Sequence, residues 1–233
     1  MEKDVLHIGS VEIDVTFKEI KNLHLSVHPP HGRVTIASPD FYDLEKVKIY
    51  AATKLAWIKR EQAKIRSQER EEPKSMITRE SHQFLGKRYL LKIIEANRSK
   101  LVLKHHTIEL YALPNATLEQ KKRTLYNWYK RELETVIGRL VNEYAEQMKL
   151  AAINFGIRKM KTKWGSCNIE KRMLWFNIEL AKKPVECIEY IVVHELVHLL
   201  ERNHNKNFII LMDKFLPGWK VQKKFLNELP VHH

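Results

Sequence analysis

The stretch IVVHELVHLLERNH, residues 191–204, places three histidines and two glutamates among apolar residues. If it forms a helix, His194 and His198 lie about 40° apart around the axis and one turn apart along it, so their imidazoles can converge on one metal ion. Glu195 lies about 100° from His194, where it can hold a metal-bound water without binding the metal itself. This H-E-x-x-H pattern is typical of zinc hydrolases in which the glutamate is the general base.

A catalytic zinc ion usually has three protein ligands and one open position. Glu201 faces the right side, but it lies about 10 Å beyond His194 along the axis, so a role outside the ligand shell is favoured. The sequence RNHN can end the helix, with Asn203 in the left-handed conformation common after helices. A turn there would bring His204 back toward the pair. We therefore expect His204 to be the third ligand, with Phe208 anchoring the turn.

The opposite side of the same helix is apolar, as a buried helix requires. The residues that form this side are Ile188, Val192, Leu196, Leu199 and Leu200. Buried polar groups without partners are costly, so two histidines and a glutamate on the other side favour a metal site. A pair of structural histidines is the alternative interpretation.

The balance of charges is strongly positive, with 41 Lys and Arg against 28 Asp and Glu and a net charge of +13. Such a charge attracts anions, so nucleic acid, nucleotides and acidic peptides are candidate partners. The lysines are scattered, however, and an ordinary solvated surface is the alternative.

The two cysteines, Cys167 and Cys187, form neither a CxxC pair nor a disulfide framework, and we expect small buried side chains in a reducing compartment. The first residues, MEKDVLHIGSVEIDV, do not resemble a signal peptide. No stretch approaches the roughly 20 apolar residues that span a bilayer. The sequence therefore predicts a soluble cytoplasmic protein that does not bind membranes.

Strands and helices fall in blocks along the chain. Strands are expected over 5–38, a helix over about 44–71, a strand meander over 82–113, a long helix over 117–150 with Thr117 as N-cap, strands over 154–164 and 173–180, a helix starting at Pro184, and two short helices after Asn203. No internal repeat is evident. Because there is no regular alternation of strand and helix, the α+β class is favoured over a parallel α/β sheet.

Five C-terminal segments, KTKWGSC, FNIELAKKP, IEYIVVHELVHL, NHNKNF and LPGWK, together resemble the YgjP-like metallopeptidase domain family. Its members are predicted metal-dependent hydrolases related to the SprT-like and WLM zinc proteases of the zincin group. Four further segments, LSVHPPHGRVTIASP, KLAWIKREQAKI, FLGKRYLL and LYNWYKRELETVIGRL, are similar to the family's N-terminal half, so the resemblance covers nearly the whole chain.

The resemblance implies a zincin-like fold in which His194, His198 and His204 bind the metal and Glu195 is catalytic. It divides the chain into a β-rich N-terminal region, 1–116, and a zincin-like catalytic region, 117–233, within one compact unit. The active-site helix is then expected beside a small mixed sheet.

Related zincins have a strand that borders the cleft and pairs with an extended peptide. The segment 173–180 is expected to be that strand, with Asn177 pointing toward the substrate. Alternatively, the Asn177 amide bonds to nearby backbone.

Three further residues are candidates for binding substrate. Trp164 and Ser166 are carried over, together with Gly165, as members of the W-G-S-C motif, and Tyr190 is a candidate donor to the oxyanion because it lies one turn before His194.

The function predicted is hydrolysis by a zinc metallopeptidase with one Zn²⁺ ion, although manganese and nickel remain alternatives. The expected substrate is a peptide or an anionic small molecule. Two other functions stay open because of the net charge of +13: hydrolysis of nucleotide phosphoanhydride bonds, and nucleic-acid binding by a protein with a structural metal.

Overall fold

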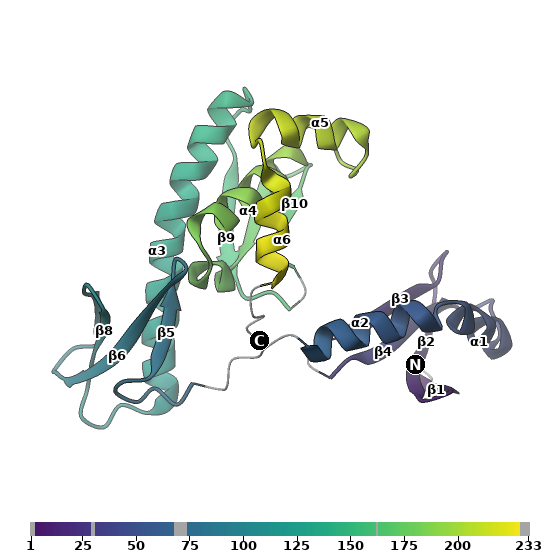
Figure 1. Cartoon of the computed structure of the whole chain (residues 1–233), viewed down its shortest axis with the longest axis horizontal. Coiled ribbons are helices and arrows are strands. Elements are labelled where there is room, and N and C mark those ends of the chain that lie inside the picture. Colours follow the sequence, from purple (N-terminus) through teal and green to yellow (C-terminus); the bar gives the residue numbers. More distant parts are fainter. Residues whose placement is uncertain (1–2, 29–30, 68–73, 162, 229–233) are drawn as a thin grey trace. The chain divides into compact units, whose positions relative to one another are not determined.

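The computed structural model describes residues 3–28, 31–67, 74–161 and 163–228 (Figure 1). Contacts within the chain define two compact units, which among the described residues cover 3–67 and 74–228. The division that the sequence predicts at 116/117 lies inside the second unit. The strands before that position and the helix after it share one core, in which Leu91 and Ile108 are buried with Leu125 and Leu133. Three small sheets and several helices confirm the α+β class.

The first unit is a four-stranded sheet followed by two helices. Its elements are β1 (Lys3–Ile8), β2 (Val11–Lys18), β3 (His24–His28), β4 (Arg33–Pro39), α1 (Leu44–Thr53) and α2 (Leu55–Ser67). The strand order is β1-β2-β4-β3, with β2 and β4 parallel and the outer pairs antiparallel. Alternate residues of β2, among them Ile13 and Val15, are fully buried, as the alternating pattern of the sequence predicts.

The single helix predicted over 44–71 is interrupted at Lys54, and its last four positions lie outside the described residues. The hydroxyl of Thr53 donates to the carbonyl of Tyr50 (2.7 Å), and the Lys54 N–H donates to Ala51 O (3.1 Å). The Lys54 N–H thus bonds to the third residue before it, and α2 begins at the next residue, Leu55.

The second unit begins with a sheet that has the topology of the first. Its strands are β5 (Ser81–Phe84), β6 (Lys87–Glu95), β7 (Lys100–Leu103) and β8 (Thr107–Ala112). Their order is β5-β6-β8-β7, with β6 and β8 parallel and the outer pairs antiparallel. The predicted meander is therefore wrong, because β8 lies between β6 and β7. The two sheets therefore share one strand order, a repeat that is not evident in the sequence.

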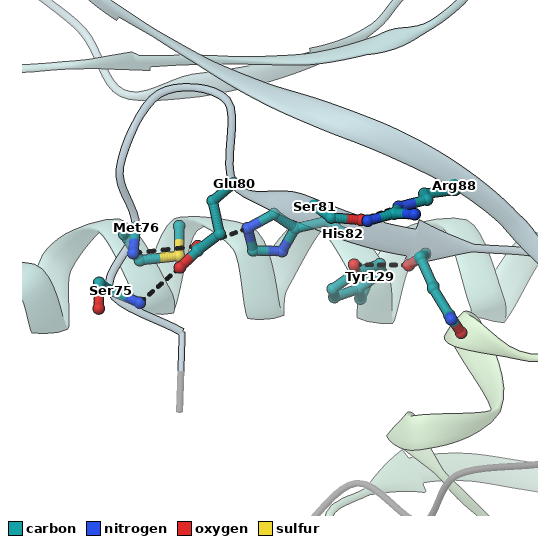
Figure 2. A network of polar contacts seen from close by, with 8 residues as sticks. Ser75, Met76, Glu80, Ser81, His82, Arg88 and Tyr129 are labelled. Atoms are coloured by element: carbon teal, nitrogen blue, oxygen red, sulfur yellow. Dashed lines mark hydrogen bonds and ion pairs between the residues drawn. The ribbon is translucent and has the colours of Figure 1, made fainter. Parts of the chain in front are cut away.

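A polar network fixes the start of this unit (Figure 2). The carboxylate of Glu80 contacts three groups, the backbone N–H of Ser75 (2.7 Å), the backbone N–H of Met76 (3.1 Å) and the buried Nε2 of His82 (2.8 Å). On the same strand, the carbonyl of Gln83 accepts a hydrogen bond from the Tyr129 hydroxyl (2.7 Å). These contacts attach β5 both to the preceding segment and to the helix that carries Tyr129.

That helix, α3 (Leu118–Gln147), is the longest element and links the two sheets of the second unit (Figure 1). Thr117 is its N-cap, as predicted, and forms a capping box with Gln120. Its buried face contacts β7 and β8 as well as β9 (Asn154–Arg158) and α4 (Val185–Val197). None of the helices that the structure describes is long and apolar enough to cross a membrane.

The third sheet contains β9, β10 (Gly165–Asn168) and β11 (Met173–Asn177), and is followed by the short 3-10 helix η1 (Ile178–Lys182). The order is β10-β11-β9, so β11 is the central strand. The prediction that segment 173–180 borders the cleft is therefore wrong. Only its first five residues form a strand, and the edge beside α4 belongs to β10, which the sequence analysis did not predict. The chain then continues through α4, α5 (Lys206–Phe215) and α6 (Trp219–Glu228).

Candidate metal centre

The helix α4 carries the first two histidines. Pro184 is its N-cap, and Ile188, Val192 and Leu196 on its apolar side are fully buried. Regular helix ends at Val197, earlier than the sequence predicts, although the N–H of His198 still bonds to the carbonyl of His194 (3.3 Å). Both imidazoles therefore remain one turn apart on the outer side of α4.

The turn after α4 differs in mechanism from the one expected. Asn203 does not have the positive φ of a left-handed residue. Instead, the carboxylate of Glu201 accepts a hydrogen bond from the Asn203 N–H (3.2 Å), and the Asn205 side chain caps α5 by accepting from the Phe208 N–H (3.0 Å). Side-chain oxygens thus accept from two backbone N–H groups of this turn.

This turn brings the three histidines together. The Nε2 atoms of His204 and His194 lie 3.0 Å apart, and the ring centroids of His194, His198 and His204 are 4.7–4.9 Å from one another. One ring nitrogen from each residue lies within 4.8 Å of the other two. The buried ring of Phe208 contacts all three imidazoles, with centroids 4.6–5.0 Å away. Phe208 therefore packs where an anchor for the turn was expected.

The three donors fit a divalent metal such as zinc. Ligand nitrogens about 2.0–2.1 Å from a tetrahedral ion lie about 3.3 Å apart, close to the spacing of the His194 and His204 nitrogens. The Nδ1 of His198 faces the carbonyl of Glu201 (3.2 Å), which leaves its Nε2 for the cluster. Burial, together with the neighbouring imidazoles and Lys223, lowers the pKa of His194 to about 3. Burial also lowers the pKa of His198, so both rings are neutral and able to bind metal at neutral pH.

Glu195 lies against the backbone of β10. Its side chain is only 5% exposed, and burial raises its pKa to about 8, although the positive charge of Lys163 acts in the opposite direction. A methyl group added at Gly165 would lie 2.6 Å from Oε1 and 2.8 Å from Cγ of Glu195, closer than carbon atoms approach. Gly165 therefore leaves the space that the Glu195 carboxylate occupies.

A cavity of about 480 Å³ contains this cluster. It is lined by Lys163, Trp164, Gly165, Ser166, Cys167, Ile169, Ile191, His194, Glu195, His198, Arg202 and His204. Trp164 and Ser166, which the sequence analysis named as substrate-binding, do lie in this wall. Cys167, expected to be buried, is half-buried and lines the cavity, whereas Cys187 is fully buried.

Asn177 and Tyr190 are not part of the cavity wall. The amide of Asn177 donates to the carbonyls of Met160 (3.0 Å) and Lys163 (2.9 Å), so it bonds to nearby backbone, the alternative that the sequence left open. It therefore holds the loop that carries Lys163 rather than facing substrate.

Tyr190 stacks on Trp219, with ring centroids 6.0 Å apart and an angle of 7° between the planes, and its ring lies 5.8 Å from that of His194. Burial raises the pKa of its hydroxyl to about 12. Trp219 in turn donates to Asp213 (2.7 Å). The Tyr190 ring therefore packs between those of Trp219 and His194. Because Tyr190 does not line the cavity, its position does not favour the predicted role at the oxyanion.

Comparison with known proteins identifies the chain as a member of the YgjP-like metallopeptidase domain family, which matches residues 21–229. Two solved structures of metallopeptidase zymogens are similar to part of the chain. Jannalysin of Methanocaldococcus jannaschii has 26% identity over 39% of this chain and 90% of its own, with a TM-score of 0.35. Abylysin of Pyrococcus abyssi has 18% identity over 41% of this chain and 99% of its own, with a TM-score of 0.37. A search of curated proteins gave no significant match.

Sequence reasoning missed three features of this site. The sequence analysis named Gly165 only as a motif residue, although a lone glycine in a strand often marks a close backbone approach such as the one to Glu195. The short segment Gly165–Asn168 has too few residues to show a strand pattern. Lys163 and Arg202 appear in the sequence only as two among many cations, and no pattern distinguishes them.

Proposed function

We propose that this protein is a zinc-dependent peptidase of the zincin type, with His194, His198 and His204 as metal ligands and Glu195 as general base. One observation carries the proposal. Three imidazoles and a carboxylate share one cavity, and among the described residues the cluster contains no fourth donor. A site with three ligands and an open position is catalytic rather than structural in type.

A bound Zn²⁺ would supply acidification of water and polarisation of the scissile carbonyl. Glu195 accepts the proton of the attacking water and later delivers it to the leaving amine. A cation held by the three histidines favours the ionised carboxylate, opposing the burial that raises the pKa of Glu195 to about 8. The Phe208 ring and the carbonyl of Glu201 hold the imidazoles in orientation.

The strand β10 is the proposed site for the substrate backbone. It pairs with β11 on one side only, and Gly165, Ser166 and Cys167 from β10 line the cavity. An extended peptide can add to such an edge through main-chain hydrogen bonds, which places its carbonyl groups near the catalytic cluster.

Replacement of Glu195 by Gln tests this function. We expect the Glu195→Gln protein to bind one equivalent of zinc, as wild type does, and to lose about 100- to 10,000-fold in peptide turnover, the range that general base catalysis contributes. Metal content by elemental analysis and cleavage of a quenched peptide library are the measurements. Unchanged turnover would exclude the mechanism.

The His204→Ala protein tests the ligand set independently of activity. Loss of one of three ligands should weaken zinc binding at least tenfold in a competition titration with a chelating dye. His106→Ala is the matched control, because His106 is exposed and lies outside the cluster. Equal zinc affinity of the His204→Ala and wild-type proteins would contradict the proposed ligand.

Hydrolysis of nucleotide phosphoanhydrides is a second candidate, favoured by the cations Lys163 and Arg202 in the cavity wall. A panel of nucleoside triphosphates assayed beside the peptide library separates the two reactions. Release of pyrophosphate or phosphate that depends on Glu195, without peptide cleavage, would favour the nucleotide reaction.

A further inference from the structure

The catalytic cavity is continuous with a second one along β10. The second cavity, of about 510 Å³, is lined by Cys167, Asn168, Ile169, Glu170, His198, Leu199, Leu200 and Arg202. Four of these residues, Cys167, Ile169, His198 and Arg202, also line the first. The two cavities together form one groove, which follows the edge of β10 from Lys163 to Glu170 and passes the metal centre.

Two cations line this groove, and the charge of one of them, Lys163, acts on the Glu195 carboxylate. Arg202 lines both cavities and Lys163 lines the first, and both side chains are exposed. Neither forms an ion pair with any acidic group among the described residues. The acidic groups of the groove are the general base Glu195 in the first cavity and Glu170 in the second. The lining therefore holds two cations and two carboxylates, and the metal ion of the proposed site would add further positive charge beside Glu195.

The charge of the whole chain is concentrated in the same unit. Residues 1–71 carry 12 Lys and Arg against 11 Asp and Glu, whereas residues 72–229 carry 29 against 17. The loop between β9 and β10 contributes Lys159, Lys161 and Lys163, all exposed. The long-range electrostatic field of this unit therefore attracts anionic ligands.

We propose that the groove selects extended acidic peptides, with one acidic side chain facing Lys163 and a second facing Arg202. The inference rests on the proposed peptidase function and names the substrate class of that site. A peptide is favoured over a nucleic acid because the groove follows a strand edge, whose N–H and C=O groups pair with a peptide backbone. The lining also includes apolar residues, Ile169, Ile191 and Leu199 among them, whereas a groove for single-stranded nucleic acid follows the phosphate backbone with positive charge.

The experiment measures binding separately from cleavage. The full-length Glu195→Gln protein, loaded with zinc, is titrated into fluorescent ten-residue peptides in which each position in turn is Asp, Asn or Lys. We expect Asp at two positions to bind about fivefold more tightly than Asn, the range for a partly exposed ion pair, and less so in 0.3 M than in 0.05 M NaCl.

Charge-reversed variants assign each preference to its residue. Arg202→Glu should convert one Asp preference into a Lys preference, and Lys163→Glu should do so at the other position. Arg139→Glu is the matched control, because Arg139 is exposed on α3, outside the groove, and its replacement changes the net charge by the same amount. This control should retain both Asp preferences.

Three results would overturn the inference. These are equal binding of Asp and Asn peptides, an equal loss in the Arg139→Glu control, and displacement of the best peptide by a single-stranded DNA oligonucleotide at the same concentration. Wild-type cleavage without any acidic preference would refute the groove's selectivity and leave the peptidase function intact. Acid-selective binding without cleavage by the wild type would support the groove and refute the peptidase function.

Discussion

The two four-stranded sheets have the same strand order and the same directions, and the second packs against the elements that lead into the metal centre. In each, a two-residue loop joins the first two strands, Gly9–Ser10 in one sheet and Leu85–Gly86 in the other. The second loop lies against the start of the catalytic helix. The Leu85 N–H donates to the Ala181 carbonyl (2.8 Å), and a methyl group at Gly86 would lie 2.7 Å from Pro184 Cγ. A methyl group at Gly9 would meet no atom of its own unit within 4 Å.

The helices that follow the two sheets differ in length and in the core that they join. In the first unit, α1 ends after ten residues and α2 packs separately, around the small core of Ile13, Ile36 and Ile58. In the second, α3 continues for 30 residues and buries Leu133 and Ile137 in a core shared with α4. The comparison shows that the same strand topology can be followed by two short helices with a small core of their own, or by one long helix whose core extends to α4.

The largest effect on stability is expected from replacing one core residue in each unit. Ile13→Ala and Leu133→Ala should each cost about 4 kcal/mol, because both side chains are fully buried. Hydrogen exchange read by mass spectrometry should show faster exchange of β1–β4 in the first variant and of β5–β11 in the second. Faster exchange across both units in either variant would show that they unfold together.

The two loop glycines should differ in their effect on stability. Both have positive φ, +58° for Gly9 and +77° for Gly86, so alanine is strained by about 1 kcal/mol at either site. Gly86→Ala adds the clash with Pro184, for a total of about 3 kcal/mol. Thermal unfolding of the two variants measures the difference. Equal losses would mean that the second loop does not support α4.

Gly165→Ala should reduce peptide turnover about 100-fold, which is about 2.7 kcal/mol, because the new methyl group displaces the Glu195 carboxylate. Glu195→Asp shortens that side chain and relieves the contact. In the Glu195→Asp background, Gly165→Ala should therefore cost much less than in wild type, whereas independent effects would multiply. Gly9→Ala, in the other unit, should leave turnover unchanged.

The smallest expected effects concern the helix caps that follow each sheet. Asp43 accepts from the Lys46 N–H (2.8 Å) at α1, and Thr117 accepts from the Gln120 N–H (3.3 Å) at α3. Alanine at either position should cost about 1 kcal/mol, measured by urea unfolding, while Asp43→Asn and Thr117→Ser should retain most of the stability. A loss confined to one cap would show that the two helices depend on their caps unequally.

Much of this architecture is local enough to be predicted from sequence. Alternating residues identify β2, the motif around His194 identifies α4, and Thr117 marks the start of α3, because each signal lies within a few neighbouring residues. His204 is predictable as well, since a helix stop precedes it. The form of the turn was not predictable, however. The sequence suggested a left-handed Asn203, whereas in the structure the Asn203 N–H donates to the Glu201 carboxylate.

The order of the strands is not local, and there the sequence predictions are wrong. Nothing in residues 87–112 distinguishes a meander from a sheet in which β8 is inserted between β6 and β7, because both bury the same side chains. The assignment of the cleft edge to β11 has the same origin. Strand pairing depends on which hydrophobic face meets α3, and that is a property of the packed core.

The packing of α3 against β5 has a practical consequence. A shortened protein that begins at residue 117 would retain His194, His198 and His204, but it would uncover Trp128 and Tyr129, whose rings lie 4.6 and 6.2 Å from that of Phe84. Exposed aromatic surface of this kind promotes aggregation. A minimal soluble fragment for crystallisation or directed evolution should therefore start near residue 74, ahead of the strands that shield those rings.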